Sequence, residues 1–192
     1  MHIQIDAEIP LIYRHAQKQA PFAAALALTL TAKDGQEDVR ASLPSKFKLR
    51  NTWTARNICF APASKTTLEA RVTAPDYLAL QETGGTKTPV SGTHIGIPNR
   101  QALGDGILRA SKRPRGLLEK KRVFLLTAES GKRFVAQRTS RKSQPIRILY
   151  ALERSQNVEP IFGMFETVRA TVDQRFAMRF DEALQRAIAT AR

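Results

Sequence analysis

The feature that most constrains the fold is an apolar stripe along the C-terminal segment of the chain. Charged residues lie between its members, as an amphipathic helix requires. The spacing predicts a long helix that begins near Pro160 or Ile161. The stripe covers about seven helical turns and consists of Phe165, Val168, Val172, Phe176, Phe180, Leu184 and Ile188.

This stripe is longer than a small sheet needs for cover, so two kinds of packing remain open. Most of it can form the core of a single chain, and part of it can pack against a neighbouring subunit. The candidate subunit-interface residues are Phe176, Phe180 and Leu184.

A second helix is expected near the N-terminus, over residues 20–43, where Ala and Leu are dense. Pro21 suits the first turn of a helix, and Pro44 is expected to end it. The small Ala side chains allow another element to approach closely, either a sheet or a copy of the same helix. After this helix, alternating residues at 66–73 predict a half-buried strand.

Gly and Pro are frequent between residues 83 and 106, which is typical of an extended loop, with a short strand expected at residues 94–97. The basic segment that follows, residues 109–116, has no apolar periodicity and is interpreted as a mobile arm. The chain is therefore expected to form one domain, residues 1–192, with a long loop or arm at about 83–120.

Positive charge is concentrated between residues 109 and 147. Thirteen Lys and Arg residues against Glu119 and Glu129 give this stretch +11 of the formal +14 of the chain. Such a density attracts polyanions and binds them with release of counterions, which makes DNA or RNA the first partner to consider. A solvated basic surface without a ligand is the alternative. The candidate nucleic-acid-binding residues are Arg109, Lys112, Arg113, Arg115, Lys120, Lys121, Arg122, Lys132 and Arg133.

The second half of this basic stretch predicts a β-hairpin, with strands at residues 121–127 and 133–138 and a turn at 129–131. A third apolar run at residues 146–152 can pair with it. The predicted fold class is therefore α+β, with an antiparallel β-sheet packed against the N-terminal helix and the long C-terminal amphipathic helix.

Catalytic chemistry has little support in the sequence. His94, Asp105 and Ser91 can be drawn as a hydrolytic group, but no spacing fixes their geometry. The Gly84–Gly85 pair before Lys87 lacks the remaining features of a phosphate loop, and Cys59 in an apolar run is expected to be a buried thiol. No cofactor, metal site, enzymatic activity, secretory signal or membrane span is expected.

The order of elements resembles the minor tail protein Z family of tailed bacteriophages. The resemblance rests on the Ala/Leu-rich helix that runs into residues 39–44, the Glu82–Thr83–Gly84–Gly85 motif, the basic hairpin, and the C-terminal helix preceded by Val158–Glu159–Pro160. The chain is also similar to the wider tail-completion group at the head-to-tail junction. The Gly/Pro-rich loop at residues 83–106 departs from the family pattern.

This resemblance implies a non-enzymatic virion protein that caps the tail tube and docks it to the head connector. The implied partners are copies of the chain in a homo-oligomeric ring, with a hexamer expected, the tail tube or tail terminator protein, the head-tail connector proteins, and packaged DNA. The implied location is the tail or neck of the virion, with host cytoplasm during assembly. The alternative is a free protein that binds nucleic acid without sequence preference.

Overall fold

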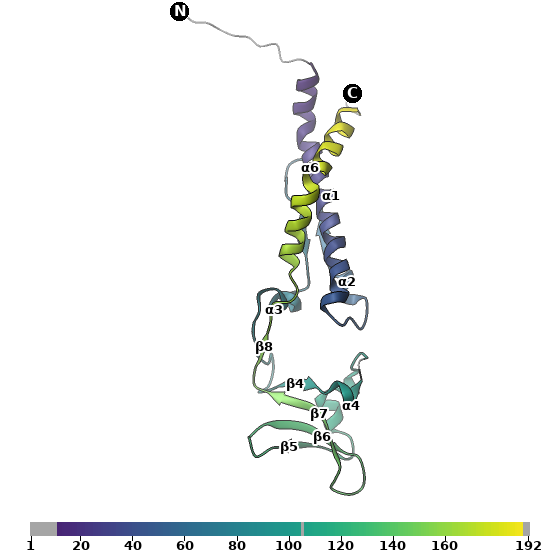
Figure 1. Ribbon diagram of the computed structural model, residues 1–192, viewed down its shortest axis with the longest axis vertical. Coiled ribbons are helices and arrows are strands. Elements are labelled where there is room, and N and C mark those ends of the chain that lie inside the picture. Colours follow the sequence, from purple (N-terminus) through teal and green to yellow (C-terminus); the bar gives the residue numbers. More distant parts are fainter. Residues whose placement is uncertain (1–10, 105, 190–192) are drawn as a thin grey trace, which may run out of the picture. The chain divides into compact units, whose positions relative to one another are not determined.

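The computed structural model of the chain describes residues 11–104 and 106–189, with side chains from residue 19 onward. It confirms the mixed α+β class, with two long helices packed together and antiparallel sheets (Figure 1). Two compact units are distinguished within the chain. Met1–Leu78 with Phe162–Arg192 forms one, which we call the helical unit, and Ala79–Ile161 forms the other, which we call the sheet unit.

Two helices, α1 (Leu11–Lys46) and α6 (Met164–Ala189), lie side by side in opposite directions in the helical unit (Figure 1). The predicted N-terminal helix is therefore confirmed, but it starts earlier than expected, so Pro21 lies inside it. Pro44 also lies inside α1, because the last turn closes across it through a 2.8 Å hydrogen bond from Phe47 N to Leu43 O. A proline inside a helix lacks the N–H donor and crowds the carbonyl four residues earlier, so Pro44 disturbs the last turns of α1 without ending the helix before Lys46.

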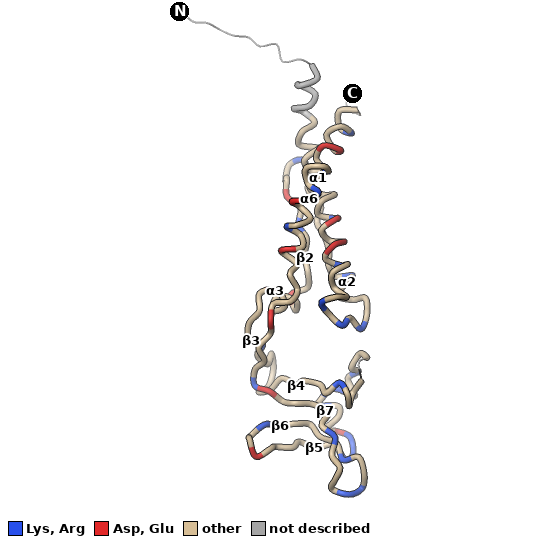
Figure 2. The backbone as a smooth tube through the Cα atoms, viewed as in Figure 1, with Lys and Arg blue, Asp and Glu red and all other residues tan. Residues whose placement is uncertain are grey.

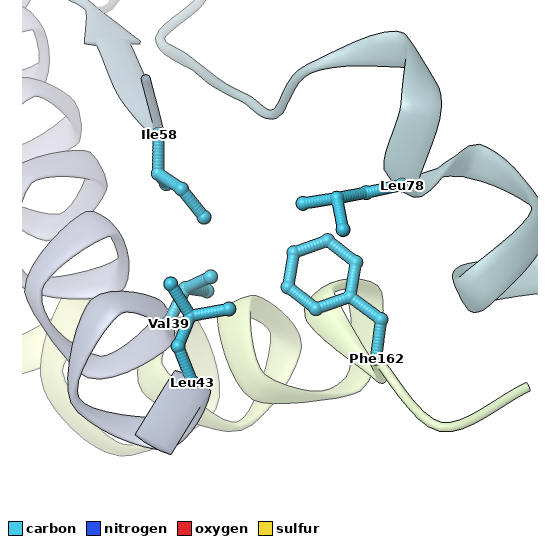
Figure 3. Packing of buried hydrophobic residues seen from close by; sticks show 5 residues of the cluster. All are labelled: Val39, Leu43, Ile58, Leu78 and Phe162. Atoms are coloured by element: carbon cyan, nitrogen blue, oxygen red, sulfur yellow. The ribbon is translucent and has the colours of Figure 1, made fainter. Parts of the chain in front are cut away.

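The apolar stripe does form a helix, and α6 begins three to four residues after the expected start. At the α1–α6 contact, small buried residues allow close approach, with Ala23 and Ala27 of α1 against Ala183 and Ala187 of α6. Figure 3 shows the side chains of a larger cluster pointing toward one another, built from Val39, Leu43, Ile58, Leu78 and Phe162.

Short elements complete the helical unit. The hairpin of β1 (Cys59–Ala61) and β2 (Arg71–Thr73) joins α1 to the rest of the unit, together with α2 (Trp53–Arg56) and the 3₁₀ helix η1 (Asp76–Leu78). The strand expected over residues 66–73 is shorter than predicted. A local turn takes the place of strand pairing at the start of this segment. Ser64 N donates a hydrogen bond to Thr67 O, and the Ser64 hydroxyl accepts one from Thr67 N.

The prediction that Cys59 is buried is wrong. Cys59 is exposed on β1, whereas Ile58 is buried and Phe60 is half-buried. Successive strand residues point to opposite faces, so a continuous apolar run does not imply that each member is buried.

The sheet unit contains a four-stranded antiparallel sheet in the order β4-β7-β6-β5. The predicted hairpin is confirmed as β5 (Val123–Thr127) and β6 (Arg133–Arg138), and the third run pairs with β6 as β7 (Ile146–Glu153). The short strand expected near residue 94 is β4 (Ile95–Pro98), which pairs with the other side of β7. The core of this unit consists of Leu117, Val135, Leu149 and Tyr150.

A separate two-stranded sheet is formed by β3 (Gly85–Lys87), which precedes β4, and β8 (Gln156–Val158), which follows β7. The short helices of the unit are α3 (Ala79–Thr83), α4 (Arg100–Leu103), η2 (Ala110–Lys112) and α5 (Pro114–Leu118). The expected long loop is thus interrupted by regular elements.

The interpretation of residues 109–116 as an arm is also wrong, because η2 and α5 fold onto the sheet. The Tyr150 hydroxyl donates to Lys112 O at 2.9 Å, and Leu117 is buried in the core of the unit. A Cβ placed on Gly116 would lie only 2.7 Å from Ala110 O, so glycine permits the close packing of the two turns. One buried Leu in a five-residue helix is too little for an apolar period to be visible in the sequence.

Candidate nucleic-acid interface

The positive charge of the chain is concentrated in the sheet unit. Residues 79–161 contain sixteen Lys and Arg residues and six Asp and Glu residues, which gives +10 of the +14 total. Among the residues that the structure describes, none of these sixteen cations forms an ion pair. The charge is therefore available to an external anion.

All nine predicted nucleic-acid-binding residues lie in this unit, and all are exposed except Arg133, which is half-buried. The fold places five of them at the two ends of the β5–β6 hairpin and the other four around η2 and α5. Lys132 and Arg133 lie at the turn end of the β5–β6 hairpin, and Lys120, Lys121 and Arg122 precede β5 at its other end. Val123 pairs with Gln137 and Thr127 with Arg133, so the two ends lie about 14 Å apart at 3.4 Å per residue.

The open end of the hairpin has more cations than the turn end. Arg138 N donates to Arg122 O at 2.9 Å, which places the two backbones together, and the Arg138 guanidinium lies 5.2 Å from the centre of the Phe124 ring. Arg141, Lys142 and Arg147 follow on the connection to β7 and on β7 itself. Figure 2 shows Lys and Arg at both ends of the hairpin.

Arg122 has a backbone φ of 68°, which is uncommon for a residue with a Cβ. The left-handed conformation costs about 1 kcal/mol or more. Arg122 lies where the chain turns from α5 into β5, and its side chain is exposed.

A second cationic group lies around η2 and α5. Arg109 immediately precedes η2, Lys112 ends it, and Arg113 and Arg115 follow at the start of α5. The hydrogen bond from Tyr150 to Lys112 O fixes this segment on the sheet. Burial raises the pKa of the Tyr150 phenol, and the charges of Arg113 and Arg100 lower it in part. Arg100, on α4, therefore belongs to the same electrostatic environment.

Sequence reasoning missed Arg100 and Arg154, because both lie outside the densest stretch of charge. The fold brings both residues close to the basic segment. Arg100 follows Pro98, which pairs with Tyr150, and Arg154 directly follows β7. The signal that could have found them is the net charge counted over the whole unit.

The predicted interface residues Phe176, Phe180 and Leu184 lie on the side of α6 that packs around the Ala cluster shared with α1. They are half-buried within the chain, and the Phe176 and Phe180 ring centroids are 6.2 Å apart. The structure therefore gives them a role inside the chain. Different α6 side chains remain exposed, among them Phe165, Val172, Met178 and Ile188.

A polar ladder between α1 and α6 was not predicted. Arg175 contacts Asp38 at 3.2 Å, Arg179 contacts Asp34 at 3.0 Å, and the Thr171 hydroxyl donates to Asp38 at 2.8 Å. The i, i+4 spacing of the two Asp residues and of the two Arg residues is the signal in the sequence.

The structure does not support the candidate hydrolytic group of His94, Asp105 and Ser91. His94 Nδ1 and Thr93 Oγ1 are joined by a hydrogen bond of 2.7 Å, and Asp105 lies outside the described residues. Gly84 and Gly85 lead from α3 into β3, so the sequence before Lys87 is followed by a strand where a phosphate loop needs a helix.

Within residues 11–104 and 106–189, no three His, Cys, Asp or Glu side chains gather in a way that could hold a metal ion. In the same residues, no helix has both the length and the apolar character of a membrane span. Comparison of the chain with protein-family models, with curated proteins and with solved structures finds no match.

Proposed function

We propose that this chain is a structural virion protein of a tailed bacteriophage. It acts as a tail-completion or neck component that caps the tail tube, joins it to the head connector, and presents a basic surface to the end of the genome. The observation that carries the proposal is the sheet unit: a small folded unit with +10 of charge and, in its described part, no internal ion pair.

The distribution of charge supports a division of labour between the two units. The helical unit has fifteen Lys and Arg against eleven Asp and Glu, and its described cations include the cross-helix pairs of Arg175 and Arg179. Its long helices also leave apolar side chains exposed, such as Phe165 and Met178. These features suit a scaffold that packs against other protein subunits, in the proposed ring and against tail terminator or connector proteins.

The sheet unit suits phosphate contact without sequence readout. Its cations are on exposed turns and strand ends, where long side chains reach phosphates readily. The two short α-helices that carry some of these cations, α4 and α5, have four and five residues. A recognition helix that reads base edges in the major groove is longer.

Cryo-electron microscopy of purified virions with a tag on the C-terminus of this chain tests the proposal. We expect tag density at the head-proximal end of the tail, in a ring of copies, and none in untagged particles. Virions that lack the chain, or that carry the tag elsewhere, contradict the proposal.

The second candidate is a free protein that binds nucleic acid without sequence preference, and the same unpaired cations favour it. The two candidates differ in location. A chain that binds duplex DNA in vitro but is absent from purified particles supports the second candidate, whereas co-purification with tails that contain no DNA supports the first.

A further inference from the structure

A pocket of about 300 Å³ opens at the turn end of the four-stranded sheet. Three segments of the sheet unit line it: the residue before β4, the β5–β6 turn, and the end of β7 with the bend after it. The polar side chains in its lining are His94, Ser130, Lys132, Glu153, Arg154 and Ser155.

The strand register explains why these segments meet. β7 lies between β4 and β6, with Ile95 opposite Glu153 on one side and Arg133 opposite Leu152 on the other. His94 precedes Ile95, and Lys132 precedes Arg133. The two side chains therefore flank the end of β7 from its two neighbouring strands.

The pocket holds several hydrogen-bond donors. Neither Lys132 nor Arg154 forms an ion pair with a residue that the structure describes. The contact with Thr93 occupies His94 Nδ1. With Thr93 as the donor of that bond, the proton of the neutral ring is on Nε2, which can then donate to a ligand.

We propose that this pocket binds a phosphate group. Arg154 offers the planar fork that matches phosphate oxygens, and Lys132 offers a compact charge. Glu153 has the opposite charge to Lys132 and Arg154, so the pocket has a net charge of +1 when His94 is neutral. The volume is at the lower end of the range for ligand pockets, about 300–1,000 Å³, which favours a phosphate with at most a small attached group. The site does not depend on a role in the virion.

The phosphate can belong to nucleic acid or be free in solution, and one experiment separates these sources. Amide chemical shifts of the ¹⁵N-labelled full chain are followed at constant ionic strength. The titrants are inorganic phosphate, a duplex with 5′-phosphate ends and the same duplex with 5′-hydroxyl ends. We expect saturable shifts at Ser130, Gly131 and Ser155.

Each pattern of response identifies a source. Shifts with inorganic phosphate alone indicate a free phosphate, additional shifts with only the 5′-phosphorylated duplex indicate a DNA end, and equal shifts with both duplexes indicate phosphodiesters. The absence of saturable shifts at these amides with all three titrants overturns the proposal.

Paired variants separate the pocket from the general charge of the sheet unit. We expect the double variant Lys132→Ser with Arg154→Ser to weaken binding of the responding titrant by about tenfold or more, because both charged donors are lost. Arg141→Ser with Lys142→Ser removes the same charge outside the pocket. It should change binding of inorganic phosphate by less than about twofold, and it should weaken duplex binding less than the pocket variant does. Equal losses in the two double variants overturn the proposal.

The acidic residue gives a test in the opposite direction. Glu153→Gln should tighten binding of the responding titrant by about threefold to tenfold, since a repulsive charge in contact with the ligand is removed. Glu129→Gln makes the same change in net charge on the β5–β6 connection, outside the pocket lining, and serves as the control. Far-UV circular dichroism and thermal unfolding verify that each variant is folded, and an equal response of the two Gln variants contradicts the pocket.

Discussion

Arg179 on α6 donates two parallel hydrogen bonds to the carboxylate of Asp34 on α1. Nε donates to Oδ2 at 3.0 Å and Nη2 donates to Oδ1 at 3.3 Å. The hydrogen bond with Asp34, together with its charge, raises the pKa of the Arg179 guanidinium. The Asp34 side chain is only 12% exposed, so this pair lies within the helix contact rather than on the surface.

Replacing Asp34 by Asn should destabilise the helical unit by about 1–3 kcal/mol, because two charge-assisted hydrogen bonds are weakened at a mostly buried position. Urea unfolding followed by circular dichroism measures the change. Asp173→Asn is the matched control on α6, where the Asp173–Arg169 pair is 4.0 Å long and both side chains are largely exposed. We expect less than about 0.5 kcal/mol there, and equal losses in the two variants would contradict the role given to Asp34.

The apolar side of α6 can be tested with Phe176→Asp. The ring packs around the Ala cluster between the helices, so a charge there should cost several kcal/mol and give insoluble or largely unfolded protein. Met178→Asp is the control, because that side chain is 50% exposed on the same helix. A Phe176→Asp chain with the melting temperature of the Met178→Asp chain would show that the assigned face is wrong.

Tyr150→Phe removes the hydrogen bond to Lys112 O that holds η2 on the sheet. At pH 7 we expect a loss of about 1 kcal/mol in unfolding free energy. Burial raises the folded-state pKa of Tyr150 above its unfolded value, so the stability that this phenol contributes is complete below about pH 10 and falls as the pH rises toward the folded-state value.

The difference in stability between the wild type and Tyr150→Phe should therefore become smaller above about pH 10. Denaturant unfolding of both proteins between pH 8 and pH 11 provides the measurement, with the variant correcting for all other groups that titrate. A difference that stays constant over this range would argue against a buried phenol.

Removing Arg109, Lys112, Arg113 and Arg115 together, by substitution with Ser, should weaken binding to duplex DNA without a change in sequence preference. If all four contact phosphates, the log–log salt slope becomes shallower by up to about 3.6. All four side chains are exposed, so the fold should be retained. In virions, we expect the variant to join tails but to release DNA or leave heads unattached.

The control for that variant removes four exposed cations from the helical unit, at Lys33, Arg56, Lys65 and Arg169. Its salt slope should stay close to that of the wild type. Equal slopes for all three proteins, with normal genome retention, would mean that the charge on η2 and α5 is only a solvated surface.

The elements that could be predicted from the sequence are those whose signal is repeated or local. The apolar stripe around Phe176 is long enough to define α6, and the turn before Lys132 defines the β5–β6 hairpin. The fold of residues 109–118 could not be predicted for two reasons. Leu117 is the only buried residue of the segment, and Tyr150, whose hydrogen bond to Lys112 O holds the segment on the sheet, is distant in sequence. The pairing of Asp34 with Arg179 depends on the helix register, which neither segment contains by itself.

The charged site shows the same limit. The concentration of cations between residues 109 and 147 could be predicted from the sequence, but the separation of the hairpin cations into two ends follows from the strand register. The placement of His94 beside Arg154 likewise depends on β4 and β7 being neighbours.

The chain leaves the helical unit after Leu78 and returns at Phe162, and these two residues are members of one buried cluster (Figure 3). The whole sheet unit is thus an insertion into the helical unit, and the packing of Leu78 against the cluster of Phe162 holds its two attachment points together. Because a short connection between such points costs little loop-closure entropy, the helical unit should accept deletion or exchange of the sheet unit. Under the proposed function, lineages could then replace the unit proposed to contact the anion while they keep the unit proposed to contact other subunits.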